Sequence, residues 1–189
     1  MRLSKTTDIK FYEKVTADMD KVEEIQKINK EIAIKFNKIE KKLASAKKIR
    51  ELLEELIAGI ESEFAIPFVW LTLIENEKAA PVIAAVKSSD KLRNRLNIVS
   101  ADLFTQVLPS GDKPVLANKD LQPYYKLLPP SNKYFIKSLA IVPFKIGGAI
   151  IGSWNNGDAV SERYLPDMET DLVGKFADYV SGRLTEMSK

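Results

Sequence analysis

Apolar residues recur every three or four positions through the first third of the chain. Set in a strongly charged background, they form one narrow stripe, which is typical of a coiled-coil seam rather than of a helix in a globular core. All nine prolines and seven of the eight glycines follow Phe64, so Gly59 is the one helix-breaking residue in this stretch. The pattern predicts one long N-terminal helix from about Asp18 to Glu63.

A lone helix of this length is not stable in water, so we expect it to form a homodimer through a coiled coil. Two shorter helices folded back as a hairpin are the alternative, although between Lys21 and Leu56 only Asn29 and Asn37 resemble turn residues. The seam residues expected to be buried against the second chain are Val22, Ile25, Ile32, Ile39, Leu43, Leu53, Leu56 and Ile60.

The charges along this predicted helix bear on its orientation in a dimer. Residues 35–50 carry a net charge of +6 and residues 51–63 a net charge of −5. An antiparallel crossing near Arg50 would bring the two blocks together, but surface ion pairs contribute only about 0–1 kcal/mol each, so both orientations stay open. The basic block could contact phosphates, yet the acidic block beside it favours a solvated helix flank, and we expect no nucleic-acid partner.

After Phe64 the pattern changes to short apolar runs separated by polar and proline-containing segments. Gly147-Gly148 predicts a hairpin turn, and Pro166 suits the first turn of a last helix. The order of these segments predicts an α+β domain with an antiparallel sheet and helices packed on one side. The predicted division is a helical coiled-coil segment, 1–45, and the α+β domain, 46–189. The predicted strands are 68–74, 81–86, 113–117, 136–146 and 149–154, with a further helix at 100–108.

The composition excludes much chemistry. The chain has no His and no Cys, which removes thiolate nucleophiles, Ser-His-Asp triads and Cys/His zinc sites. Asp167, Glu169 and Asp171 gather where the last helix is expected to begin, and the positive end of a helix dipole accounts for acids there without a metal. We therefore expect no enzymatic activity, no metal and no cofactor.

Targeting signals are also lacking in the sequence. The first fifteen residues have no apolar run of the kind a signal peptide needs, and no window reaches the roughly 18 apolar residues of a membrane span. We expect a cytoplasmic protein without a membrane partner.

The last third of the chain contains the runs SLAIVPFKIGGAIIGSWNNGD, at residues 138–158, and RYLPDMETDLVGKFADYVSGRL, at residues 163–184. These runs resemble the C-terminal signature of the bacterial GAF-like family called domain of unknown function 484, a relative of PAS-type sensor domains. The similarity extends from Ala46 to the end and is most specific over residues 138–184. Glu169 stands where the family pattern has glycine, and Asn155-Asn156-Gly157 replaces an apolar-Gly-Ser type of run. The residues that carry the resemblance are Ser138, Leu139, Pro143, Gly147, Gly148, Gly152, Tyr164, Pro166, Met168, Thr170, Asp171 and Leu172.

This resemblance implies a GAF-like sensor fold with small-molecule-binding ancestry. GAF sheets usually enclose a pocket beneath the loops opposite the sheet, and residues 118–134 form a long loop of that kind. The alternative is that the aromatic residues of the candidate site only pack in the core and anchor loops. We hypothesise a non-enzymatic sensory or regulatory signalling module, or alternatively a protein-interaction adaptor with a vestigial pocket. The candidate ligand-binding residues are Trp70, Tyr124, Tyr125, Tyr134, Trp154 and Asn155.

Overall fold

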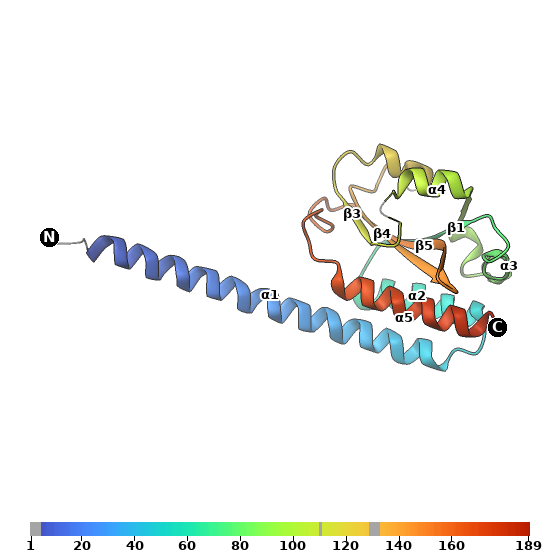
Figure 1. Ribbon diagram of the computed structural model, residues 1–189, viewed down its shortest axis with the longest axis horizontal. Helices are drawn as coiled ribbons and strands as arrows, with labels where there is room; N and C mark the ends of the chain where they lie inside the picture. The colour runs from blue at the N-terminus through green and yellow to red at the C-terminus, as the bar shows by residue number, and fades with distance from the viewer. Residues whose placement is uncertain (1–4, 110, 129–132) are drawn as a thin grey trace.

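The computed structural model describes residues 5–109, 111–128 and 133–189, with side chains of the first helix described from Met19 onward. Within these residues the protein is an α+β structure of five α-helices and a five-stranded mixed sheet (Figure 1). The elements are α1 (Lys5–Ser45), α2 (Ile49–Phe64), β1 (Phe68–Ile74), α3 (Ala80–Lys87), η1 (Arg93–Arg95), β2 (Leu96–Val99), α4 (Ala101–Val107), β3 (Val115–Ala117), η2 (Gln122–Lys126), β4 (Ser138–Ile146), β5 (Ala149–Asp158) and α5 (Asp171–Met187).

The N-terminal helical region is a hairpin rather than one continuous helix. The chain turns at residues 46–48, and α2 runs back along the second half of α1 (Figure 1). The carboxylate of Glu51 accepts a hydrogen bond from the backbone N–H of Lys47 at 3.0 Å, as an acid in the first turn of a helix often does. The predicted continuous helix is wrong, and the hairpin alternative is correct.

The hairpin also changes where the charged blocks and the seam lie. Lys38 on α1 pairs with Glu63 on α2 at 3.2 Å, so the basic and acidic blocks meet within one chain. The predicted burial of the C-terminal seam against a second chain is wrong, because its side chains are already covered by α2, α5 and the sheet of their own chain. These residues are Ile39, Leu43, Leu53, Leu56 and Ile60.

The N-terminal part of the same stripe is uncovered. Val22 is 53% exposed and Ile25 is 54% exposed, whereas Ile32 is half-buried at the edge of the core. Figure 1 shows why: α1 extends well past the sheet before its second half reaches α2 and α5. The predicted division after residue 45 coincides with the end of α1, yet Phe36 and Leu43 belong to the same hydrophobic core as the sheet.

The strand order is β2-β1-β5-β4-β3, with β1 and β2 parallel and the other pairs antiparallel. The expected fully antiparallel sheet is therefore wrong. Residues 81–86, predicted as a strand, lie in α3, where Val82 and Val86 are buried four positions apart on one helical face. This helix connects β1 to β2, as a parallel pair requires a crossover.

The two faces of the sheet pack against different layers. One face contacts α1, α2 and α5 through residues such as Leu71, Phe144 and Trp154. The other face is covered by α4 and by the segment around η2, which pack on Ile74, Leu139 and neighbouring residues (Figure 1). The predicted α+β class is confirmed, although α4 lies on the face of the sheet opposite to α1, α2 and α5.

The C-terminal elements form a hairpin followed by a helix. Gly147 and Gly148 have φ angles of 56° and 80°, so the predicted turn between β4 and β5 is confirmed in a conformation that favours glycine. The last helix begins at Asp171, not at Pro166. Among the described residues no helix is both long enough and apolar enough to cross a membrane.

Candidate functional site

The predicted ligand-binding residues do not line one cavity. Trp70 pairs with Asn155 across β1 and β5, whereas Trp154 pairs with Leu71, so the two tryptophans point to opposite faces of the sheet. Trp154 packs among the helices with Phe144 and Phe176, and Trp70 packs beneath α4 and η2. The alternation of side chains along a strand thus separates residues that sequence reasoning grouped together.

Trp70 and Asn155 belong to a buried hydrogen-bond network that anchors the η2 segment. The indole Nε1–H of Trp70 and the hydroxyl of Thr72 donate to the carbonyl oxygen of Leu127, at 2.7 and 3.0 Å. The side-chain amide of Asn155 is hydrogen-bonded to the hydroxyl of Thr72 at 2.9 Å and to the hydroxyl of Ser153 at 2.8 Å. These polar groups are satisfied within the protein, which favours the anchoring role over ligand binding.

The three tyrosines of the predicted site are also dispersed. Tyr124 and Tyr125 lie on η2, half-buried against the apolar cluster under α4, and Tyr134 is 79% exposed. The loop does cover the sheet as expected, but Leu121, Leu127 and Leu128 fill the space beneath it. Residues 129–132 of that loop lie outside the described residues.

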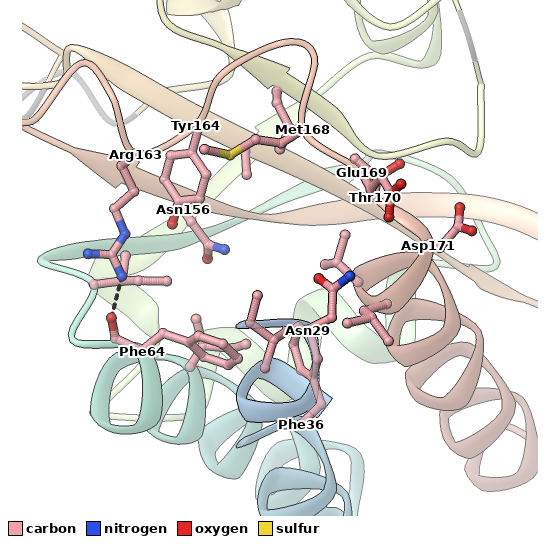
Figure 2. A pocket seen from close by; sticks show the side chains of 17 residues that line it. Asn29, Phe36, Phe64, Asn156, Arg163, Tyr164, Met168, Glu169, Thr170 and Asp171 are labelled. Carbon is pink, nitrogen blue, oxygen red and sulfur yellow. Dashed lines mark hydrogen bonds between the residues drawn. The ribbon is translucent and has the colours of Figure 1, made fainter. Parts of the chain in front are cut away.

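A cavity of about 270 Å³ lies instead on the helical face of the sheet. It forms where α1 leaves the domain, between α2, the β3–β4–β5 edge and the segment that precedes α5 (Figure 2). The floor is open because Ala140, a small residue, pairs with Asn156 in the sheet. Its lining comprises Asn29, Ile32 and Phe36 of α1; Ile60, Phe64 and Ile66; Leu116, Ala140 and Asn156; and Arg163, Tyr164, Met168, Glu169, Thr170, Asp171, Leu172 and Val173.

Asn156 is the most distinctive residue of this cavity. Its side chain is 6% exposed, and its amide oxygen has no hydrogen-bond partner among the described residues. The buried hydroxyl of Tyr164 also lacks a well-aligned hydrogen bond there, although the side chains of Asn156 and Arg163 lie close enough to oppose the rise of its pKa. A buried polar atom without a partner costs about 1–3 kcal/mol, so these groups are expected to find partners in a bound molecule or water.

Arg163 fixes the cavity's outer wall. Its guanidinium donates to the carbonyl oxygen of Phe64 at the end of α2 (Figure 2) and lies 3.4 Å from the carboxylate of Asp158. The same group stands 6.0 Å from the ring centroid of Tyr164. Burial raises the pKa of Tyr164 to about 12, while the nearby positive charge of Arg163 opposes that rise. The tyrosine is therefore a neutral hydroxyl at physiological pH.

The charges at the cavity indicate what it can accept. Arg163 is already paired with Asp158, whereas Glu169 and Asp171 stand exposed at the rim with no ion-pair partner among the described residues. Most of the wall is apolar. Together these features fit a small, largely apolar molecule that is neutral or cationic and that donates a hydrogen bond to Asn156. No cluster of metal-ligating side chains occurs in the described part of the chain.

The sequence matches no protein-family model and no curated protein.

Sequence reasoning missed this cavity, although one signal pointed to it. The run Asn155-Asn156-Gly157 puts amides where an apolar residue was expected, and the two asparagines occupy opposite faces of β5. Asn155 is satisfied by its neighbours and Asn156 is not. Only the tertiary structure distinguishes the two, because both are buried residues on the same strand.

Proposed function

We propose that this protein is a non-enzymatic sensory or regulatory module with a GAF-like domain, which binds a small ligand in the cavity at the base of α1. The observation that carries the proposal is the unpartnered amide oxygen of Asn156, buried in a cavity that α1 helps to enclose. A central, mostly antiparallel sheet, in which only β1 and β2 run parallel, with α2 and α5 on one face supports the resemblance of the domain to the GAF family.

The position of the cavity suggests how a ligand would be sensed. Phe36 on α1 faces the same space as Asn156 on β5 and Met168 before α5 (Figure 2). Ile32 of α1 also lines this space. A ligand that contacts all three segments stabilises one packing of α1 against the domain over others. The effect of binding is thereby conveyed to the part of α1 beyond the sheet, which provides a coupling between two sites.

The exposed stripe on α1 supports self-association as the output. Met19, Val22, Ile25 and Ile28 are large apolar side chains, each about half exposed. A contiguous apolar helix face in water is typical of an interaction surface. We propose a homodimer through this stripe; binding of a different protein to it is the alternative role, that of an adaptor.

Native mass spectrometry of the freshly purified protein tests ligand binding. Ala140→Leu adds bulk to the cavity floor, and Ala58→Leu, at an exposed position on α2, is the matched control. A retained small molecule, present in the wild type and the control but lost from Ala140→Leu, is the expected result. A wild type that retains no molecule and shows no thermal shift with a panel of small amines and amides would contradict the proposal.

Sedimentation velocity tests self-association. Ile25 and Ile34 are similarly exposed, at 54% and 50%, but nine residues apart they lie on opposite sides of α1. Ile25→Lys is expected to dissociate the dimer and Ile34→Lys to leave it intact. A monomeric wild type at micromolar concentration would exclude the homodimer and favour the adaptor role.

A further inference from the structure

We infer that two copies of α1 pair in antiparallel orientation and that the helix of each copy passes beside the cavity of the other. The inference rests on the homodimer proposed above and adds its geometry. It follows from three observations: the face of α1 that is exposed, the charges along that face, and the residues that line the cavity.

The exposed stripe and the domain lie on the same face of α1. Val22 and Ile25 are in phase with Ile32, Phe36, Ile39 and Leu43, because the steps between neighbouring stripe positions are three or four residues. From Phe36 onward this face is covered by the helices of its own domain. A partner helix can therefore pack on this face only along the part of α1 that precedes about Ile32. Because packed helices cross at an angle, the first residues of the partner pass beside the domain rather than through it.

This placement discriminates between the two orientations. In a parallel pair, both domains would lie at the same end and on the sides of the two helices that face each other. They would therefore compete for the same space. In an antiparallel pair the domains lie at opposite ends, and the two stripes meet along the part of α1 that extends beyond the domain in Figure 1.

The charges along the free part of α1 favour the same orientation. Residues 18–24 carry a net charge of −3, and residues 25–38 carry a net charge of +3. A parallel pair aligns like blocks, whereas an antiparallel pair that crosses near residues 24 and 25 aligns opposite ones. This crossing point also lies within the exposed stripe.

The second copy then reaches the ligand cavity. With a crossing near residues 24 and 25, the partner helix passes Asn29 and Ile32, which belong both to the stripe face and to the cavity lining. The wall formed by α1 is thus extended by the partner helix. Occupancy of the cavity and pairing of the helices become linked, because both depend on the same face of α1.

Pulsed electron–electron double resonance between single spin labels tests the orientation. The chain contains no cysteine, so Lys27→Cys and Lys41→Cys each introduce one labelling site at an exposed position on α1. For antiparallel pairing the helical rise predicts a separation of about 50 Å between the two labels at residue 41. The labels at residue 27 are expected within about 25 Å of each other, given helix axes 8–10 Å apart.

The outcomes separate this inference from the function on which it rests. A long distance at residue 41 together with a short distance at residue 27 supports the antiparallel pair. Short distances at both sites would overturn the orientation and leave the homodimer standing. The absence of any dipolar coupling, with a monomer in sedimentation, would overturn both.

Discussion

Two neighbouring asparagines on β5 show how differently one residue type can serve a protein. Asn155 lies within a closed network with Thr72 and Ser153, which holds the η2 segment on the sheet. Asn156, one position later, points to the opposite face with an unpaired amide oxygen among the described residues. The first stabilises the fold, while the second carries a cost in stability that a ligand-binding role explains.

Leucine substitutions at these two positions are expected to have opposite effects on stability. Asn156→Leu removes an unsatisfied buried group and should raise the free energy of unfolding by about 1–3 kcal/mol. Asn155→Leu leaves the hydroxyls of Thr72 and Ser153 without their hydrogen-bond partner. It should lower the free energy of unfolding by a similar or larger amount. Urea denaturation of both variants measures the difference. A loss of stability in Asn156→Leu equal to that in Asn155→Leu would show that Asn156 also has a structural role.

Tyr164 makes stability depend on alkaline pH. Its pKa is about 12 in the folded protein, against an ordinary value near 10, so the unfolded chain loses this proton first. The stabilisation is complete below pH 10 and is lost as pH rises from 10 to 12, by at most about 3 kcal/mol. Tyr164→Phe is expected to reduce that loss in denaturation experiments across this range. An unchanged pH profile in the variant would contradict the assignment.

At the scale of elements, β5 depends on a glycine that allows β1 to approach. Gly152 has φ +154°, and a β-carbon there would lie 2.2 Å from the carbonyl oxygen of Thr72. It also lies beside the bulge in the β4–β5 register, between Phe144 and Lys145. No larger residue can take this position without displacing one of the two strands.

Alanine at Gly152 is therefore expected to destabilise the protein by about 3 kcal/mol or more. Gly182 is the control, because it lies in α5 and a β-carbon added there would meet no described atom within 4 Å beyond its chain neighbours and the backbone of its own helix. Gly182→Ala should stabilise the protein by about 0.5–1 kcal/mol through helix propensity. Thermal and urea unfolding of both variants measure whether each substitution lowers or raises the stability as expected. A Gly152→Ala protein as stable as the wild type would disprove the close approach of β1 to β5 at this position.

Sequence patterns predicted most of the larger elements and few of the connections. The strands β1 (68–74) and β4 (138–146) are rich in apolar and β-branched residues, so their signal is local. The break after Ser45 has no glycine or proline, and it depends on the packing of α1 against α2 and α5. Residues 81–86 could not be distinguished from a strand by apolar content alone.

The site was harder to predict than the fold because it depends on contacts between distant segments. Asn29, Asn156 and Tyr164 come from α1, β5 and the segment before α5, and nothing in their local sequence relates them. Aromatic content directed attention to Trp70 and Trp154 instead, and the sheet places these residues on opposite faces. The cavity exists partly because residue 140 is the small alanine rather than a larger residue. A small residue within a strand is a poor sequence signal for a cavity.

At the scale of the whole molecule, the free part of α1 and the domain are expected to be separable. The covered core begins near Ile32 and Phe36, and the stripe from Met19 to Ile28 contributes little to it. The domain should therefore fold without the stripe, and the stripe should act only between molecules.

Deletion of residues 1–26 tests this separation. The shortened protein is expected to keep its free energy of unfolding within about 0.5 kcal/mol when measured as a monomer. Its melting temperature should become independent of protein concentration, whereas that of the full chain should rise with concentration. Calorimetry over a range of concentrations measures both quantities. Loss of the folded state on deletion would show that the domain needs this part of α1.

The projecting helix also has a mechanical consequence. About 27 residues of α1 precede Ile32 within the described chain, a lever arm of about 40 Å at 1.5 Å per residue. With its fulcrum at the cavity, a tilt of about 8° would displace the far end by about 5–6 Å, close to the pitch of one helical turn. A tilt of α1 too small to disturb the packing of Phe36 or Ile39 would thus produce a large displacement at the far end of the helix. That displacement is enough to change which residues of a partner the end of α1 contacts.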